Sequence, residues 1–214
     1  MQLYRLPSIL GPMHGDARTR LLHCAEQAFL AKGYRGAKLG EIALAAGISK
    51  KTIYKFVESK EALFCLVVEE AIAESLQPAS LVAQGDDLAG ALHDFLLPYM
   101  TLAFSERGIH AFRMLLSEAF QFPDLAQRYF ASVRTTVMAP IEAWLAVQSE
   151  AGRLAIASSE SAAEMLLAMT VTERAQRLAL GLEAPPTPEA TKAQLTAAIA
   201  IFLRGVMPLP EEAA

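Results

Sequence analysis

The sequence predicts an all-α protein of about nine helices, and three observations favour this fold class. Apolar residues recur at every third or fourth position along most of the 214-residue chain, which is the spacing of one helix face. Alternating runs of β-branched residues, which are typical of strands, are missing from the sequence. Apolar residues make up 53% of the chain and charged residues 20%, so the chain can build a substantial core.

The first four helices have recognisable start and stop signals. Asp16 can cap the first helix, which ends at Gly33. Gly47 separates the second helix from the third, because glycine adopts the left-handed conformation that a tight turn requires. Ser59 can cap the fourth helix, and Pro78 ends it. These helices are expected over residues 16–33, 39–46, 49–56 and 59–78.

Short stretches of turn-forming residues separate the five helices that follow. Pro98 and Pro140 lie inside helical patterns, where each removes a backbone hydrogen bond and is expected to bend or split its helix. The helices are expected over residues 86–104, 106–120, 123–150, 158–182 and 187–205. The two prolines should leave space between neighbouring helices.

The charge of the chain is divided unevenly between its two ends. Residues 1–60 contain 10 lysines and arginines against 4 aspartates and glutamates, a net charge of +6. Residues 61–214 contain 9 against 19, a net charge of −10. Such a division is typical of a basic module that binds a polyanion, joined to an acidic module with another task.

The sequence also predicts where the protein works. No apolar run approaches the roughly 18 residues that a membrane span needs. Residues 1–15 are interrupted by charge, proline and glycine, so we expect a flexible arm and not a secretory signal. Two cysteines in helical patterns are typical of a reducing compartment. We therefore expect a cytoplasmic protein, associated with the nucleoid if the polyanion is DNA.

Residues 39–58 meet the requirements of a helix-turn-helix motif. Ala43 is the small residue that lets the second helix cross closely, and Gly47 is the turn glycine four positions later. The apolar residues that would pack both helices on a third are Ile42, Ala46, Ile48, Ile53 and Phe56. The motif predicts a recognition helix at residues 49–56 that lies in the major groove of DNA.

The outward face of this recognition helix carries hydrogen-bond donors and one aromatic ring. It consists of Lys50, Lys51, Thr52, Tyr54 and Lys55. Donors at the N-terminal end of such a helix can reach base edges, and the helix N-terminus adds partial positive charge. The alternative is an ordinary helical hairpin with a solvated lysine-rich face, which explains neither the spacing of Ala43 and Gly47 nor the local charge.

The segments AFLAKGYRG, EIALAAGIS, TIY and SKEAL all fall within residues 18–66. They make this region resemble the DNA-binding domain of the TetR/AcrR family of transcriptional regulators. The resemblance implies that Thr52, Tyr54 and Lys55 contact the operator and that Lys60 binds a DNA phosphate. The later segment FRMLLSEAFQFPDLAQRYF resembles the C-terminal domains of AcrR-like and AefR-like members.

The chain departs from the family pattern at three places. The family usually has Thr or Ser at the positions of Ala37 and Lys38, so the usual hydroxyl cap and phosphate contact are missing, and Lys38 is the candidate replacement. Lys51 stands where glycine is common and adds a cation to the recognition helix. Phe56 and Val57 stand in place of an aromatic pair, which suggests altered local packing.

The resemblance and the charge division give three segments: a flexible arm at 1–15, a helix-turn-helix DNA-binding domain at 16–60, and an effector-binding and dimerisation domain at 61–214. By resemblance, the last two helices should form a four-helix interface with their copies in a second subunit. Their apolar residues are Leu166, Met169, Leu178, Leu180, Leu195, Ile199 and Phe202. A homodimer would present two recognition helices to a palindromic operator.

Adaptable apolar side chains near the two prolines are candidates for a pocket that binds an apolar or amphipathic small molecule. They are Met100, Phe104, Phe112, Phe120, Tyr129, Trp144, Met165 and Met169. The alternative for each is a place in the core without contact to a ligand. For Arg113 and Glu118, a structural ion pair or solvent exposure is favoured over a ligand contact.

These features predict a homodimeric repressor that blocks transcription from an operator in double-stranded DNA and is released by a small-molecule effector. A regulator without an effector, or an activator, would show the same sequence features. An enzyme or small-molecule carrier is disfavoured, because the four histidines form no metal-binding spacing and no nucleophile or phosphate-loop motif is found. No metal or cofactor is expected.

Overall fold

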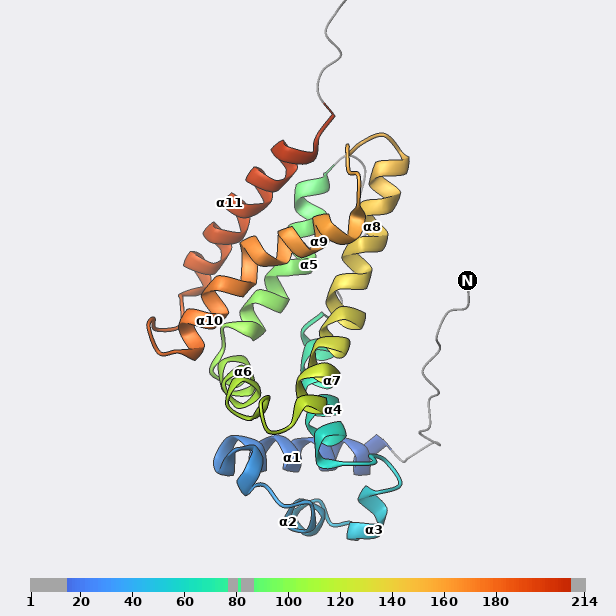
Figure 1. Cartoon of the computed structure of the whole chain (residues 1–214), viewed down its shortest axis with the longest axis vertical. Helices are drawn as coiled ribbons and strands as arrows, with labels where there is room; N and C mark the ends of the chain where they lie inside the picture. The colour runs from blue at the N-terminus through green and yellow to red at the C-terminus, as the bar shows by residue number, and fades with distance from the viewer. Residues whose placement is uncertain (1–14, 77–80, 82–86, 209–214) are drawn as a thin grey trace, which may run out of the picture.

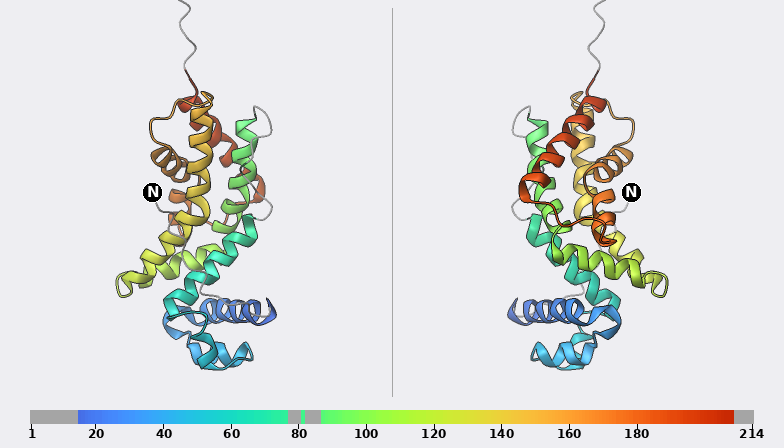
Figure 2. Two further views of the ribbon diagram at one scale, coloured as in Figure 1. Left: turned by 90° about the vertical axis from the view of Figure 1, so that its right-hand side faces the viewer. Right: turned by 90° about the vertical axis from the view of Figure 1, so that its left-hand side faces the viewer.

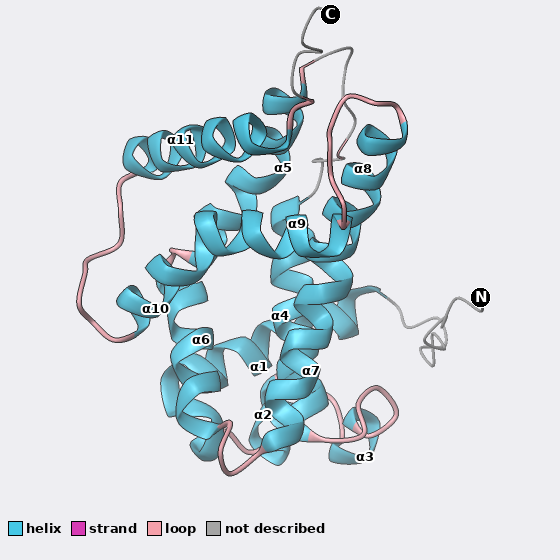
Figure 3. Ribbon diagram, turned by 45° about the horizontal axis from the view of Figure 1, so that its top comes forward, coloured by secondary structure: helices cyan, strands magenta, loops and turns pink. Residues whose placement is uncertain are grey.

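A computed structural model describes residues 15–76, 81 and 87–208 (Figure 1). Within these ranges all regular secondary structure is helical, and no strand occurs, which confirms the predicted fold class (Figure 3). The expected arm at residues 1–15 lies outside the described residues except for Gly15, at which the first helix begins. The expected end of the fourth helix at Pro78 also lies outside them.

The described part of the chain forms nine helical rods, as the sequence predicts. Two rods contain a π-helical segment, η1 in one and η2 in the other, and each continues through it. The bounds are α1 (Gly15–Gly36), α2 (Leu39–Ala45), α3 (Lys50–Ile53), α4 (Lys60–Leu76), α5 (Leu88–Ala103), α6 (Glu106–Glu118), α7 (Pro123–Val133), η1 (Arg134–Met138), α8 (Ala139–Glu150), α9 (Ser159–Leu167), η2 (Ala168–Thr172), α10 (Glu173–Ala179) and α11 (Pro188–Val206).

Helices α1, α2 and α3 form a compact unit at the bottom of Figure 1. Gly33 interrupts α1, because its φ of +66° is left-handed, and one further turn then leads to Gly36. The backbone N–H of Ala37 closes this turn by donating to the carbonyl oxygen of Gly33 at 3.2 Å. The first helix therefore extends three residues beyond the end that the sequence predicts, although the break falls at the predicted glycine.

Helix α4 connects this unit to the rest of the molecule. Its start is capped as predicted, because the backbone N–H of Ala62 donates to Oγ of Ser59 at 3.1 Å. It then packs against α1 on one side and against α5 and α7 further along. Figure 2 shows it rising from the N-terminal helices into the upper part of the molecule.

The upper part is a bundle in which α11 packs on α5 and α8 packs on α9. Helix α6 lies between the two parts, since it contacts α1 below and α10 beside it. Arg113 of α6 fixes the end of α10: its Nε donates to the carbonyl oxygen of Ala179 at 2.7 Å and its Nη2 to that of Leu178 at 2.9 Å. Arg113 therefore has a structural role, although it bonds to backbone carbonyl oxygens and does not form the ion pair that the sequence favoured.

The two internal prolines do not split their helices. Helix α5 continues through Pro98 as far as Ala103. Pro140 lies in the first turn of α8, directly after the π-helical segment η1. The missing N–H of Pro140 therefore falls where the helix changes type, a place where a break in the hydrogen-bond ladder is accommodated.

Candidate DNA-binding surface and ligand cavity

The helix-turn-helix geometry is set by Ala43 and Gly47. Ala43 is buried in the crossing, and its carbonyl oxygen accepts a hydrogen bond from the N–H of Ile48 at 3.0 Å. Gly47 has a φ of +68°, a conformation that side-chain-bearing residues rarely adopt. The predicted left-handed turn between the two helices is therefore confirmed.

The position of α3 depends on its buried residues. Ile53 is fully buried and Val57 nearly so, whereas Ile48 and Phe56 are half-buried at the edge of the core. The sequence placed Phe56 in the apolar set and overlooked Val57. α3 is also shorter than predicted: regular α-helix covers Lys50–Ile53, and hydrogen-bonded turns carry the chain on to Phe56.

Five predicted DNA contacts lie on the outer surface of this segment. Lys50, Lys51 and Lys55 are exposed, and the side chain of Tyr54 is 50% exposed. Thr52 is half-buried, because its N–H and hydroxyl both bond to Oγ of Ser49, which caps α3. The surface thus presents three exposed lysines and one tyrosine ring. The hydroxyl and N–H of Thr52 take part in capping α3.

Lys38 and Lys60 differ in how far their ammonium groups are available. Lys38 occupies the N-cap position of α2 without a side-chain cap, and its Nζ lies 3.7 Å from Oε1 of Glu41. Lys60 donates to the carbonyl oxygens of Tyr34, at 2.8 Å, and Ala37, at 3.3 Å. Helix α2 therefore starts without a side-chain cap, as the sequence predicts. The ammonium group of Lys60 is bound to the end of α1.

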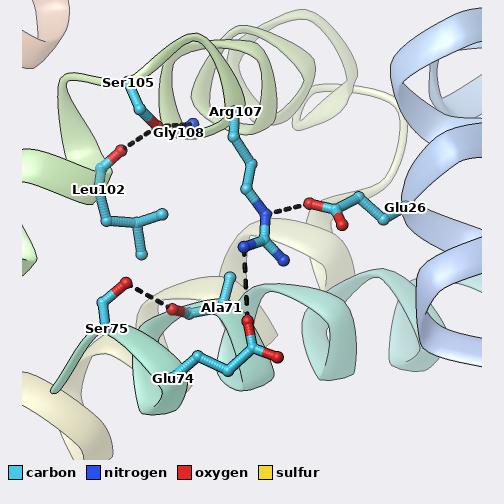
Figure 4. Close-up of polar contacts among 8 residues, drawn as sticks. All are labelled: Glu26, Ala71, Glu74, Ser75, Leu102, Ser105, Arg107 and Gly108. Carbon is cyan, nitrogen blue, oxygen red and sulfur yellow. Dashed lines mark hydrogen bonds and ion pairs between the residues drawn. The ribbon is translucent and has the colours of Figure 1, made fainter. Parts of the chain in front are cut away.

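Among the described residues, three ion pairs join the N-terminal helices to α6 and α7, and Arg18 of α1 also pairs with Glu70 of α4 at 2.9 Å. Arg107 at the start of α6 pairs with Glu26 of α1 (Figure 4), and Glu118 at the end of α6 accepts from Nε of Arg35 at 2.8 Å. The third pair links Arg128 of α7 to Glu58 in the turn before α4. Helix α6 is therefore attached to α1 at both of its ends.

An aromatic contact accompanies these ion pairs. The ring of Tyr34, near the end of α1, lies 5.3 Å from the ring of Phe122, which comes just before α7. Tyr34 also packs on Phe29 and Phe64 in the core of the N-terminal unit. Burial raises the pKa of the Tyr34 hydroxyl well above its usual range, so the hydroxyl stays protonated even at alkaline pH.

A cavity of about 340 Å³ lies where these helices meet. Helix α1 contributes Glu26, Phe29 and Leu30 to its wall, and α4 contributes Phe64, Val67, Val68, Ala71 and Ile72. The remaining wall comes from α5, α6, α7, α9 and α10 and from both π-helical segments. The size and mostly apolar lining are typical of a site for a small organic molecule.

Two of the eight predicted ligand-binding residues line this cavity, namely Phe112 and Tyr129. Met100, Phe104 and Trp144 are buried in the core away from it, and Phe120, Met165 and Met169 are on the surface. Phe120 is 96% exposed, since it follows the end of α6. Helical spacing identified apolar positions but not the direction in which each side chain faces.

The cavity wall carries few polar groups, and they cluster at two ends. Glu26 and Arg107 lie at the end next to α1, whereas Glu164, Thr172 and Gln176 lie at the end formed by α9, η2 and α10. Tyr99 and Tyr129 line the wall as well. Burial raises the pKa of the Tyr129 hydroxyl to about 12.

Both π-helical segments border the cavity. Val171 and Thr172 of η2 line it, as does Met138 of η1. The hydroxyl of Thr172 lies 3.4 Å from the carbonyl oxygen of Leu167, five residues earlier. π-helical turns are rare and often occur at functional sites, and here they widen the helices that enclose the cavity.

The apolar residues on the last two rods are mostly buried within the chain itself. Leu166, Leu178, Leu195, Ile199 and Phe202 all belong to the core. The exposed large apolar side chains on the same rods, or next to them, are Met165, Met169, Leu180, Leu182, Ile201 and Met207. Of the seven residues that the sequence assigned to the interface, Met169 and Leu180 are therefore exposed and the other five are buried.

Two further features concern the described residues as a whole. No group of three or more His, Cys, Asp or Glu side chains is arranged to hold a metal ion among them. None of the helices in these ranges combines the length and apolar character needed to cross a membrane.

The fold and the exposed cationic face of α3 define a helix-turn-helix DNA-binding protein with a second, helical C-terminal domain. Residues 21–65 match the family described as bacterial regulatory proteins of the tetR family, and residues 90–205 match the C-terminal domain of AefR-like transcriptional repressors. The chain belongs to the TetR family of transcriptional regulators, with an AefR-like C-terminal domain. Members of this family are DNA-binding regulators and not enzymes.

Solved structures of the same family resemble this one over most of their length. The flavonoid-responsive regulator FrrA is 26% identical, with a TM-score of 0.73, and the match covers 92% of this chain and all of that one. A regulator from Agrobacterium tumefaciens gives a TM-score of 0.73 at 19% identity, covering 92% and 96% of the two chains. One from Pseudomonas syringae gives 0.67 at 21% identity, covering 92% and 100%. No curated protein sequence matches the chain significantly.

Proposed function

We propose that this TetR-family regulator is a homodimeric repressor that binds a palindromic operator and is released by an amphipathic aromatic ligand. The shared wall of the cavity carries this proposal. Glu26, Phe29 and Leu30 come from the first helix of the DNA-binding unit, whereas the other lining residues come from α4 to α10. A molecule in the cavity would touch α1 directly, so it can favour a different position of α1 relative to α6.

In this proposal the surface of α3 reads the major groove. Lys50, Lys51, Tyr54 and Lys55 are exposed on one short segment, and such donors can reach base edges or flanking phosphates. Thr52 is expected to contribute its methyl group or a shared hydroxyl. Lys38 is expected to bind a phosphate at the start of α2.

Lys60 can also bind a phosphate while it holds α1. A lysine ammonium has three N–H donors, and two of them point to the carbonyl oxygens of Tyr34 and Ala37. One donor therefore remains for a phosphate oxygen. In this arrangement the DNA contact and the anchoring of α1 share one side chain.

The proposed dimer forms through the last two rods, α9–η2–α10 and α11. The support is a set of exposed apolar side chains on them, including Met165, which is 63% exposed, and Ile201, which is 61% exposed. Such side chains are typical of surfaces that bury each other in a two-fold dimer. The dimer would space its recognition helices by about 34 to 36 Å or a multiple of that distance.

The ligand class follows from the cavity and from one relative. The rings of Phe29, Phe64, Phe112 and Tyr129 line the cavity, which favours an aromatic molecule. FrrA, at 26% identity, is described as flavonoid-responsive. Flavonoids are planar, aromatic and amphipathic, so they are the first compounds to test.

The experiment has two steps. Bound fragments are first selected from genomic DNA with the purified protein, and a labelled fragment then reports DNA binding by fluorescence anisotropy while flavonoids are added. An effector should raise the melting temperature and release the DNA over the same concentration range. The variant Ala111→Phe, which fills the cavity from α6, should bind DNA but no longer respond.

Two outcomes would change the proposal. If none of the compounds both stabilises the protein and releases DNA, a regulator without such an effector is favoured. If deletion of the gene lowers transcription from the selected promoter, the protein is an activator. A repressor requires transcription to rise on deletion.

A further inference from the structure

The cavity contains one cationic side chain among its described lining residues, Arg107, and that side chain is bound to both neighbouring helices. Its Nε pairs with Glu26 of α1, and its Nη1 lies 3.5 Å from Oε2 of Glu74 of α4 (Figure 4). Its Nη2 has no hydrogen bond or ion pair to any other described residue. Arg107 therefore links α6 to both α1 and α4 at the edge of the cavity. The N–H groups of its Nη2 remain available to bind a ligand.

The backbone that carries Arg107 is fixed by a tight corner between α5 and α6. Oγ of Ser105 donates to the carbonyl oxygen of Leu102 at 2.7 Å and accepts from the N–H of Gly108 at 3.2 Å (Figure 4). A Cβ at Gly108 would lie only 2.2 Å from the same carbonyl oxygen. The backbone of this corner cannot shift easily. If the side chain of Arg107 binds another group, its partners on α1 and α4 must therefore move.

A carboxylate and a ligand anion would compete for the same guanidinium. Glu26 also lines the cavity, so an anionic group that enters this end meets Arg107 and Glu26 together. A guanidinium forms strong charge-assisted hydrogen bonds with oxyanions, and the first turn of α6 adds the partial positive charge of a helix N-terminus. The anion would gain the free donors of Arg107, and the like charge of Glu26 would be displaced.

We propose that Arg107 recognises an anionic oxygen group on an aromatic ligand and that this contact breaks its ion pair with Glu26, which releases the N-terminal end of α6 from α1. This inference rests on the proposed function, because it assumes that the cavity binds the effector. It adds the chemical class of the ligand, an aromatic acid or ionised phenol, and the contact through which binding reaches the DNA-binding unit.

The test uses two fluorescent probes with one scaffold. 8-Anilinonaphthalene-1-sulfonate carries an anionic group, whereas N-phenyl-1-naphthylamine lacks it. In the wild-type dimer both should bind, and both should be lost from the cavity in Ala111→Phe. Arg107→Gln should weaken binding of the sulfonate about tenfold or more and leave the neutral probe unchanged, because only the sulfonate uses the guanidinium.

Two further variants separate a recognition role from a structural one. Glu26→Gln should tighten sulfonate binding by about three- to tenfold, since the competing carboxylate is removed. Glu118→Gln breaks the other ion pair between α1 and α6, but neither Glu118 nor Arg35 lines the cavity. It should leave the affinity for both probes unchanged. If Arg107→Gln melts early, Arg107→Lys keeps the charge and should lose only part of the sulfonate affinity.

The DNA measurement completes the test. Sulfonate binding should weaken operator binding in the wild type and have little further effect in Glu26→Gln, where the ion pair is already absent. Equal sulfonate affinity in wild type and Arg107→Gln, with normal binding of the neutral probe, would overturn the role of Arg107 and leave the cavity intact. Failure of both probes to bind, or binding unaffected by Ala111→Phe, would instead reject the cavity as the ligand site.

Discussion

The ammonium group of Lys60 lies 4.4 Å above the centre of the Tyr34 ring and donates to the carbonyl oxygen of the same residue at 2.8 Å. The side chain of Lys60, at the start of α4, thus binds the last turn of α1. This turn follows Gly33, whose backbone angles are not helical. Burial lowers the pKa of Lys60 from its usual value. The DNA-binding unit and α4 are joined at this point.

Replacing Lys60 with Ala should therefore affect both folding and DNA binding. Loss of its charged hydrogen bonds should reduce the free energy of unfolding by about 1.5 to 3 kcal/mol. The slope of log affinity against log salt should fall by about one unit. Lys55→Ala is the matched control, because Lys55 is exposed: it should change the slope without the loss of stability. An unchanged slope in Lys60→Ala would remove Lys60 from the phosphate contacts.

Tyr54→Ala should weaken operator binding more than it alters the melting temperature, because half of its side chain faces solvent. Ile53→Ala, next to it, should instead cost about 2 to 5 kcal/mol of stability, since Ile53 is fully buried. Anisotropy with the selected DNA and thermal melting separate the two effects. Unfolding of Tyr54→Ala at room temperature would assign Tyr54 to the core.

Gly108→Ala should destabilise the corner between α5 and α6 by about 1 to 3 kcal/mol, because the added methyl group would collide with the carbonyl oxygen of Leu102. Gly205→Ala is a useful comparison. Its Cβ would meet nothing within 4 Å, and it lies inside α11, so it should stabilise the protein by about 0.5 to 1 kcal/mol. Urea unfolding of the two variants would reveal opposite signs; a neutral Gly108→Ala would mean that the corner is free to move.

Alkaline pH should reduce stability partly through Cys65. Burial raises the pKa of this thiol from 9.0 to about 12. Between these values the unfolded chain releases the proton while the folded chain keeps it, so the free energy of unfolding falls as pH rises. Cys65→Ala should lose less stability than wild type between pH 8 and pH 11. Cys24→Ala serves as the control, because it removes the other cysteine and leaves Cys65 in place.

Ile201→Glu should dissociate the proposed dimer, because it places a charge in the exposed apolar surface of α11. Lys192→Glu tests whether charge on α11 alone is responsible. At 100° per residue, Lys192 and Ile201 lie on opposite sides of the buried stripe of this helix. Analytical ultracentrifugation should find monomers for Ile201→Glu and dimers for Lys192→Glu. A dimeric Ile201→Glu would place the interface elsewhere.

The sequence predicted well what depends on short-range signals. The turn at Gly47, the cap at Ser59 and the division into nine rods follow from residue types at local spacing, and the structure contains each of them. The length of α3 was overestimated, because a helix of one turn leaves too short a pattern to delimit. The burial of Val57 in place of Phe56 likewise depends on the path of the chain after α3, which helical spacing does not give.

The cavity could not be predicted to the same extent, because it depends on which helix faces meet. Glu26 and Arg107 are 81 residues apart in the chain, and helical periodicity gives no information about such a pair. The residues that α1 and α4 contribute were overlooked, since their apolar faces look like ordinary core in the sequence. Phe112 and Tyr129 were identified because aromatic residues are frequent in both core and cavity.

The polar links between the two parts of the molecule have a consequence for protein engineering. In the N-terminal unit they use Arg18, Glu26, Arg35 and Glu58, together with the ring of Tyr34. A chimera that joins this C-terminal domain to the DNA-binding unit of another regulator should keep the contacts between the two parts if the other regulator supplies two bases, two acids and a ring at the corresponding places. These five positions would serve as a compatibility rule when domains of different regulators are combined.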